Sequence, residues 1–338
     1  DTYVENINFY GKNISVIGAD QATTIIDGDS TDGLSVVMFR NGETRSALLQ
    51  NFTITNGNAN NGSWPYSDDG GGILINEYSS PTLRNLTVTS NHANDHGGGV
   101  TIDNYSDPLL DNVTINQNST AYGGGLYVSN WSNPEIKNTI ISNNTATGDG
   151  GGVYIRERSN PTFDNVQITD NTTNLDGGGA YINIESDPIF ENVQISDNTA
   201  NDDGGGVWIS GSNSDPLMNN MVISNNSASG EGGGIWLTHD NGNPVLTIHS
   251  STISNNSASS GGGIGNYGCT VNVSYTTISG NTTSIPGGTQ GGGFYGVGGT
   301  LKMDHVEITD NTAASNGGGM WLQSINSTLN HLTVANNT

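Results

Sequence analysis

The feature that most constrains this chain is a Gly-Gly-Gly triplet that recurs ten times at nearly constant spacing. The triplets start at Gly70, Gly97, Gly123, Gly150, Gly177, Gly204, Gly232, Gly261, Gly291 and Gly317. Successive steps measure 26 to 30 residues, and a unit of that size cannot bury an apolar face alone, so it must stack on its neighbours. The chain is therefore a repeat array, and equivalent positions form columns that can be compared from one repeat to the next.

Each repeat contains short runs in which apolar and polar residues alternate. In one repeat these runs are 153–155, 162–165 and 166–171, and each ends at Gly, Pro, Asn or Asp. Alternation with period two over three to six residues indicates β-strands. Glycine makes up 49 of the 338 residues and opposes helix throughout. The sequence thus predicts three short strands per repeat.

Three strands per repeat of about 27 residues predict an all-β fold, a right-handed parallel β-helix of about twelve coils that each rise by about 4.8 Å. Ile168-Thr169-Asp170-Asn171 and Gly178-Gly179-Ala180-Tyr181 resemble the paired F-x-x-N and G-G-A-[ILV] signature of polymorphic outer-membrane-protein repeats, within the pectate-lyase-like superfamily. The first motif has Ile for Phe, and most repeats read G-G-G-[VIL] in the second. The resemblance implies this architecture and a place on a bacterial surface or outside the cell.

We expect one continuous solenoid with two parts. Residues 1–69 form N-terminal coils with an inserted turn at 58–69, which contains Trp64 and Tyr66, and residues 70–338 form the ten triplet repeats. A second inserted turn at 282–290 contains Pro286. Strand-like sequence starts at once and the chain stops where another triplet is due, so we expect a segment of a longer protein, with export and anchoring signals elsewhere.

Two columns of asparagine are expected to be structural. The first, the inner ladder, comprises Asn91, Asn118, Asn144, Asn171, Asn198, Asn226, Asn256, Asn281, Asn311 and Asn337. Stacked at one strand spacing, these amides can donate and accept hydrogen bonds along the axis. The second, the outer ladder, comprises Asn51, Asn85, Asn112, Asn138, Asn165, Asn192 and Asn220, and continues as Ser250, Tyr275, His305 and His331.

Composition limits the classes of partner that the chain can bind. Eight Lys and Arg face 32 Asp and Glu, a net charge of -24, which excludes nucleic acid and anionic membrane as natural partners and disfavours acidic polysaccharides unless metal ions intervene. No apolar run of 18 residues predicts a membrane span. Cys269 is the only cysteine and is expected to be a buried small residue. A polar, acidic repeat protein of this kind suits an extracellular or cell-surface location.

One column of large aromatic residues is the candidate ligand-binding surface. The middle residue of the strand after the triplet is Tyr127, Tyr154, Tyr181, Trp208 and Trp236 in five consecutive repeats. Strand alternation predicts that these side chains face out of the coil, as a stripe for a glycan or another cell-surface protein. Stacking of the rings on one another for structural reasons is the alternative.

A column of carboxylates lies beside it. The residue before the triplet is Asp149, Asp176, Asp203 and Glu231 in four successive repeats, and Asp202 adjoins Asp203. Clustered carboxylate oxygens suit Ca²⁺, so these five residues are the candidate metal site. The alternative is a row of solvated turn residues, since Asp is favoured before Gly. The triplets between the two columns are either the floor of an open trough or are required by turn geometry and close packing.

These columns favour a rigid stalk or adhesive module that binds a glycan or a partner surface, and no catalytic residue is assigned. A polysaccharide lyase or glycoside hydrolase is the alternative, for which Arg156 and Arg158 around Glu157, or the pair Asp202 and Asp203, would supply the chemistry. Ice binding ranks low, because Gln and Glu interrupt the threonine column that it would need.

Overall fold

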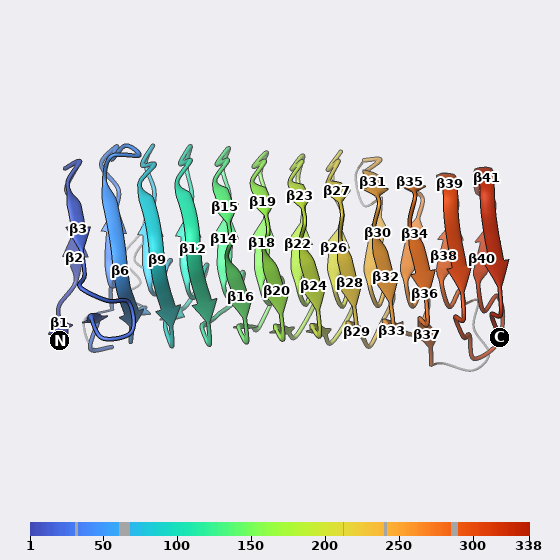
Figure 1. Ribbon diagram of the computed structural model, residues 1–338, viewed down its shortest axis with the longest axis horizontal. Helices are drawn as coiled ribbons and strands as arrows, with labels where there is room; N and C mark the ends of the chain where they lie inside the picture. Colours follow the sequence, from blue (N-terminus) through green and yellow to red (C-terminus); the bar gives the residue numbers. More distant parts are fainter. Residues whose placement is uncertain (31–32, 61–67, 212, 240–241, 285–289) are drawn as a thin grey trace. The chain divides into compact units, whose positions relative to one another are not determined.

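The strands are short, parallel and stacked coil upon coil, as the computed structural model of the chain shows (Figure 1). The structure describes residues 1–30, 33–60, 68–211, 213–239, 242–284 and 290–338. Two compact units are present, Asp1–Gln167 (unit 1) and Ile168–Thr338 (unit 2). No helix occurs among the described residues, and hence none that is long and apolar enough to cross a membrane. The inserted-turn residues Trp64, Tyr66 and Pro286 lie outside the described residues.

Unit 1 contains three sheets. The triplet sheet, which includes the strands after the glycine triplets, has β2 (Ile7–Asn8), β5 (Val37–Phe39), β8 (Ile73–Ile75), β11 (Val100–Ile102), β14 (Leu126–Val128) and β18 (Val153–Ile155). The large sheet has β1 (Thr2–Val4), β3 (Ser15–Ile17), β4 (Ile25–Asp27), β6 (Leu48–Thr55), β9 (Thr82–Thr89), β12 (Leu109–Asn116), β15 (Glu135–Lys137), β16 (Ile140–Ser142) and β19 (Thr162–Asp164). The short sheet has β7 (Asn58–Ala59), β10 (His92–Ala93), β13 (Ser119–Thr120) and β17 (Thr145–Ala146).

Unit 2 repeats the same three sheets, and β20 (Gln167–Thr169) spans the boundary between the units. Its triplet sheet has β22 (Ala180–Ile182), β26 (Val207–Ile209), β30 (Ile235–Thr238), β34 (Ile264–Tyr267), β38 (Phe294–Val297) and β40 (Met320–Gln323). Its large sheet has β23 (Ile189–Glu191), β24 (Gln194–Ser196), β27 (Leu217–Asn219), β28 (Val222–Ser224), β31 (Val245–His249), β32 (Thr252–Ser254), β35 (Thr270–Ser274), β36 (Thr277–Ser279), β39 (Thr300–Thr309) and β41 (Asn326–Ala335). Its short sheet has β21 (Thr172–Thr173), β25 (Thr199–Ala200), β29 (Ser227–Ala228), β33 (Ser257–Ala258) and β37 (Thr282–Thr283).

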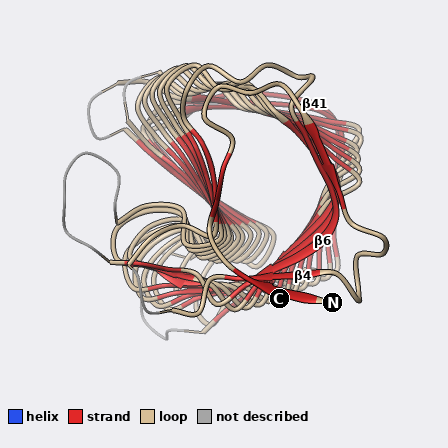
Figure 2. Ribbon diagram, turned by 90° about the vertical axis from the view of Figure 1, so that its left-hand side faces the viewer, coloured by secondary structure: helices blue, strands red, loops and turns tan. Residues whose placement is uncertain are grey.

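This arrangement confirms the predicted β-helix with three strands per coil. Equivalent residues pair in parallel register, as Thr101 does with Tyr127 in unit 1 and Trp208 with Trp236 in unit 2. The second and third predicted strands belong to one large sheet, which curves along the wall of the coil at β4 and β6 (Figure 2), and the third sheet is formed by the two-residue strands that follow the inner ladder.

The inner ladder is confirmed and lies inside the coil. Asn118 is buried, and its Nδ2 donates to Asn144 Oδ1 at 3.0 Å and to the Val88 carbonyl at 3.0 Å. Its Oδ1 accepts from both the backbone N–H and the Nδ2 of Asn91, each at 3.0 Å. Because each amide satisfies its neighbours along the axis, a polar column can run through an apolar core without unpaired groups.

Close packing against this ladder explains the glycine triplets. A Cβ on Gly99 would lie 2.9 Å from Asn118 Nδ2, and one on Gly98 would lie 2.5 Å from the Ser119 carbonyl. The first glycine of the same triplet, Gly97, has φ +59°, which favours glycine. The triplet is buried, so the idea of an open glycine trough is wrong, and turn geometry with close packing is the correct alternative.

The outer ladder is confirmed in part, because it is interrupted where Asn138 Nδ2 donates to Asp111 Oδ1 at 3.0 Å instead of to Asn112. In unit 1, Asn112 Nδ2 donates to Asn85 Oδ1 at 2.9 Å, and Asn85 Nδ2 donates to Asn51 Oδ1 at 3.1 Å. These residues have φ of 50 to 64°, a left-handed conformation that Asn tolerates better than most residues. Cys269 is free and buried, as expected.

Candidate functional site

The aromatic column is sheltered, which corrects the expectation of an exposed stripe. Its members are only 4 to 7% exposed: Tyr127, Tyr154, Tyr181, Trp208 and Trp236. Stacking is the physical reason. In unit 1 the rings of Tyr127 and Tyr154 lie 5.4 Å apart, and in unit 2 those of Tyr181 and Trp208 lie 4.3 Å apart at 8°. Parallel register places equivalent side chains one strand spacing apart, so each ring covers the face of the next.

A gap in the column gives Trp236 its position. The next repeat has Gly265 where an aromatic residue would stand, and a Cβ there would lie 2.4 Å from Trp236 Cε3. The indole therefore extends over the glycine. Beyond it, the ring of Tyr295 is stacked 6.4 Å from that of Trp236. The Trp236 ring thus occupies the space that an aromatic side chain at position 265 would otherwise fill.

The column opens into a groove in unit 2. The groove has a volume of about 390 Å³ and is lined by Asp176, Asp203, Trp208, Glu231, Trp236, Thr238 and Tyr267. β26 and β30 supply the two tryptophans, while the carboxylates precede the glycine triplets. The two columns that the sequence singled out therefore meet in one place, although Trp208 and Trp236 are only 6 and 4% exposed.

Backbone hydrogen bonds position the carboxylates. Asp176 Oδ1 accepts the backbone N–H of Asp203 at 2.9 Å, and Asp203 Oδ1 accepts that of Glu231 at 2.6 Å. In unit 1 Asp69 Oδ1 accepts the N–H of His96 at 3.2 Å in the same way. Each carboxylate thus binds the amide one coil further on, which offsets part of the repulsion between like charges.

Part of the predicted metal cluster is assembled. Oxygens of Asp176, Asp202 and Asp203 lie within 4.8 Å of one another. Glu231 lies beside Asp203 and lines the groove. Asp149 lies in unit 1 and remains a candidate from the sequence alone.

Two carboxyl groups of the groove, those of Glu231 and Asp203, have raised pKa values. Burial and the nearby charges of Asp203 and Asp202 raise the pKa of Glu231 to about 7. Burial also raises the pKa of Asp203, and Asp202 adds to this, while the hydrogen bond from the Glu231 N–H opposes it. Close to neutral pH, the Glu231 carboxyl group is therefore partly protonated and partly ionised. The groove thus contains a weak acid next to other carboxyl groups.

The two arginines of the basic cluster differ in their contacts. Arg156 pairs with Glu157 at 2.5 Å and also hydrogen-bonds to the side chain of Tyr127, whereas the guanidinium of Arg158 lies over the ring of Trp131, 5.0 Å from its centroid. The two arginines therefore make separate contacts in unit 1.

Two groups of residues were missed by sequence reasoning. One is an exposed aromatic stack in unit 1, in which Tyr78 and Tyr105 lie 5.3 Å apart and Tyr105 and Trp131 lie 6.3 Å apart. These side chains are 65, 47 and 45% exposed. Their spacing of 27 and 26 residues matches that of the triplets and would have revealed them.

The other group contains histidines that sequence reasoning placed in columns but did not bring together with carboxylates. In unit 1, Asp69, Asp95 and His96 lie together, and in unit 2, Asp304, His305 and His331 do so. His96 Nδ1 is 2.9 Å from Asp69 Oδ1 and 3.5 Å from Asp95 Oδ2. Burial lowers the pKa of His96, but the hydrogen bond and charge of Asp69, with Asp95, raise it above its ordinary value overall.

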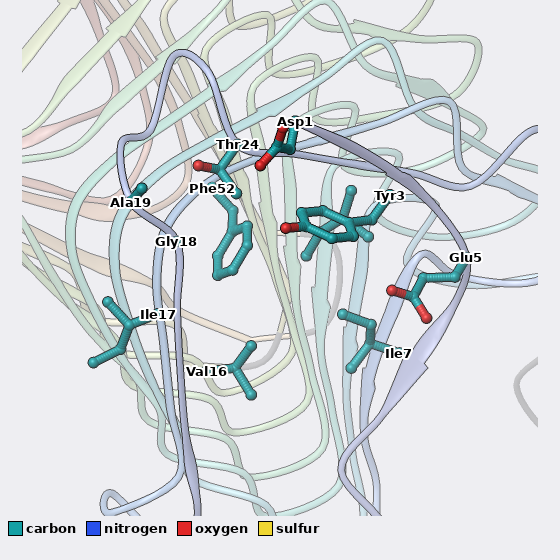
Figure 3. Close-up of a pocket in the computed structure, with 11 residues that line it drawn as sticks. Asp1, Tyr3, Glu5, Ile7, Val16, Ile17, Gly18, Ala19, Thr24 and Phe52 are labelled. Carbon is teal, nitrogen blue, oxygen red and sulfur yellow. The ribbon is translucent and has the colours of Figure 1, made fainter.

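A second hollow, of about 430 Å³, lies at the first coils of unit 1 (Figure 3). Ile7, Val16, Ile26 and Phe52 line it together with the polar groups of Asp1 and Glu5, among others. Ile26 and Phe52 are core residues, so one side of this hollow is part of the apolar core, while Asp1, Tyr3 and Thr24 place oxygen atoms at its other side.

The family follows from the sequence comparisons together with this architecture. The family model described as a right handed beta helix region matches residues 2–148 and 140–282. The chain belongs to the right-handed β-helix family. No curated protein and no solved structure matches it.

Proposed function

We propose that the chain is a rigid module of a secreted or cell-surface protein that binds a neutral glycan in the groove of unit 2. The observation that carries this proposal is the meeting of Trp208 and Trp236 with the carboxylates of Asp176, Asp203 and Glu231 in one hollow of about 390 Å³. The parts of the two tryptophan rings that reach the groove would contact the C–H groups of a sugar, and carboxylates accept hydrogen bonds from sugar hydroxyls. Residues from successive coils would bind successive sugar units.

Charge selects the class of glycan. The groove carries three carboxyl groups in a chain with net charge -24, so a uronate-rich or sulfated chain would be repelled. Neutral sugars avoid this repulsion. Another cell-surface protein remains the alternative partner, and it would need to reach Trp208 and Trp236 inside the groove.

Calcium is a separate proposal for the same unit. The oxygens of Asp176, Asp202 and Asp203 lie within 4.8 Å of one another, and hard cations bind clustered oxygen ligands of this kind. Ca²⁺ would raise the melting temperature of the protein, because it binds the folded state, and a chelator would reverse the rise. Equal melting temperatures in Ca²⁺ and in chelator would contradict the calcium proposal.

The binding test is a calorimetric titration with neutral and acidic oligosaccharides. Cello-, xylo-, manno- and chito-hexaose serve as neutral probes and oligogalacturonate as the acidic one. We expect at least one neutral probe to bind and the acidic probe not to bind without Ca²⁺. Trp236→Ala should weaken binding by more than about tenfold, a loss of about 1.4 kcal/mol. Tyr105→Ala is the matched control, since it removes an aromatic ring outside the groove. The proposal fails if no neutral probe binds, or if both variants behave alike.

Glycoside hydrolysis is the second candidate, favoured by the raised pKa of Glu231, about 7. A protonated Glu231 could donate a proton to a leaving oxygen while a neighbouring carboxylate assists at the sugar. The test is release of reducing ends from the tightest probe, compared with Glu231→Gln. Loss of release in this variant with binding retained supports hydrolysis. Binding without any release by the parent protein leaves a binding module.

A further inference from the structure

The outer ladder changes its chemistry near the end of unit 2. At the positions that carry asparagine in the earlier coils, this region has Tyr275, His305 and His331. Their φ values of 49, 54 and 46° show the same left-handed turn. The backbone therefore presents these rings in the direction in which asparagine is presented elsewhere, and both histidines are exposed.

One carboxylate faces both histidines. Asp304 Oδ1 lies 3.2 Å from His305 Nδ1 and 3.0 Å from His331 Nδ1, and the three groups offer ligand atoms within 4.8 Å of one another. The imidazole rings stack with centroids 4.2 Å apart, and His305 also stacks on Tyr275 at 4.8 Å. Parallel pairing of β39 with β41 sets the spacing, because His305 and His331 occupy equivalent positions in consecutive coils.

These separations fit a small metal ion. Tetrahedral Zn²⁺ with bonds of about 2.0 to 2.1 Å holds its ligand atoms about 3.3 Å apart. The observed N···O distances of 3.0 and 3.2 Å are close to this value. Because the two imidazole planes lie at only 22° to one another, one ring must also turn about its side-chain bonds so that both Nδ1 lone pairs point at the ion, which the exposure of both histidines allows. Two imidazole nitrogens and one carboxylate oxygen suit first-row transition ions and disfavour Ca²⁺, which prefers oxygen ligands. Among the candidate clusters found in the described residues, this one alone offers two nitrogens.

We propose that Asp304, His305 and His331 form a binding site for a divalent transition ion such as Zn²⁺. The bound ion links β39 to β41 and leaves a fourth coordination position open to water or an external ligand. Lys302 and Asp304 line a common hollow of about 270 Å³, and the ammonium of Lys302 opposes the ion. Removing that charge by Lys302→Gln therefore tightens binding.

The test is a calorimetric titration of tag-free, metal-free protein with ZnCl₂, at low ionic strength in a buffer that does not chelate. We expect one ion per chain at this site and a rise in melting temperature on binding. His331→Asn restores the residue that the column carries in unit 1, so the variant keeps the turn but loses the ligand. It should bind Zn²⁺ at least about tenfold more weakly, as should Asp304→Asn, since even removal of an outer-shell partner has this effect.

His249→Ala is the matched control, because His249 bonds to Ser274 and contacts Tyr275 instead and its loss should leave Zn²⁺ affinity unchanged. Cu²⁺ supplies a second readout, since its electron paramagnetic resonance spectrum should show coupling to two nitrogens, reduced to one in His331→Asn. Binding by the parent weaker than about 1 mM overturns the proposal, and so does equal binding by the parent and His331→Asn. In that case the short distances report hydrogen bonds between imidazoles and a carboxylate.

Discussion

The inner ladder and the groove of unit 2 are both built from columns with the same period, yet they behave differently. Every described member of the inner ladder is asparagine, and Asn226 donates to the next asparagine of the ladder just as Asn118 does four repeats earlier. The groove column varies from Tyr181 to Trp208, Trp236 and Gly265. Where every coil carries the same asparagine, the amide groups satisfy their hydrogen bonds by stacking on one another. A column that changes its side chains along the axis creates a local hollow, and chemistry can be placed there.

The largest effect should come from breaking the inner ladder. Asn226 Nδ2 donates to the Ile195 carbonyl and to Asn256 Oδ1, and its Oδ1 accepts two hydrogen bonds from Asn198. Asn226→Ala leaves several buried polar groups unpaired at about 1 to 3 kcal/mol each, so we expect a loss of at least about 3 kcal/mol in the free energy of unfolding. Denaturant titration measures it. Asn201→Ala, at an exposed asparagine, should cost less than about 0.5 kcal/mol.

The next effect concerns the gap in the groove column. Gly265→Ala places a methyl group where the Trp236 indole lies, and we expect a loss of about 1 to 3 kcal/mol from overpacking, with weaker glycan binding. A double-mutant cycle sharpens this. In the Trp236→Ala background the added methyl group should cost almost nothing, because the ring that it meets is gone. An equal cost in both backgrounds would contradict the packing that we describe.

A smaller effect should be seen in how the free energy of unfolding changes with pH. The pKa of Glu231 is raised to about 7 in the folded protein from about 4.3 in the unfolded chain, so folding favours the protonated carboxyl group. The cost of the charged form is absent at pH 4 and grows as pH rises toward 8. Since the group is partly exposed, solvent screening limits that cost to about 1 to 2 kcal/mol.

Glu231→Gln removes this titration. Relative to the parent, the variant should therefore gain about 1 to 2 kcal/mol between pH 4.5 and 8, as measured by unfolding at a series of pH values. A constant difference across that range would mean that the Glu231 carboxyl group does not titrate in the way that the groove implies.

The smallest effect belongs to the exposed stack of unit 1. Tyr105 contacts Tyr78 and Trp131 at the surface, and an aromatic pair contributes about 0.5 to 1.5 kcal/mol. Tyr105→Ala should lower stability by about 1 kcal/mol and leave glycan affinity unchanged. A larger effect on glycan binding than on stability would move the binding surface from unit 2 to unit 1.

The sequence predicted the fold and both ladders well, because the triplet period fixes which residues lie above one another. It also predicted that Trp208, Trp236, Asp203 and Glu231 lie on one face of the coil. It could not predict how exposed the aromatic column is, since alternation gives the direction of a side chain and not how far its neighbours cover it. The role of Gly265 depends on where the Trp236 ring comes to rest. The histidine cluster depends on rotamers that bring two Nδ1 atoms to one carboxylate.

The central claim is that the groove of unit 2, and not the exposed stack of unit 1, binds glycan. Two-dimensional ¹H–¹⁵N NMR of the tryptophan indole N–H groups, during titration with the tightest neutral hexaose, tests it directly. We predict that the signals of Trp208 and Trp236 shift and saturate together while that of Trp131 stays in place. A saturating shift of Trp131 with Trp208 and Trp236 unmoved would contradict the account.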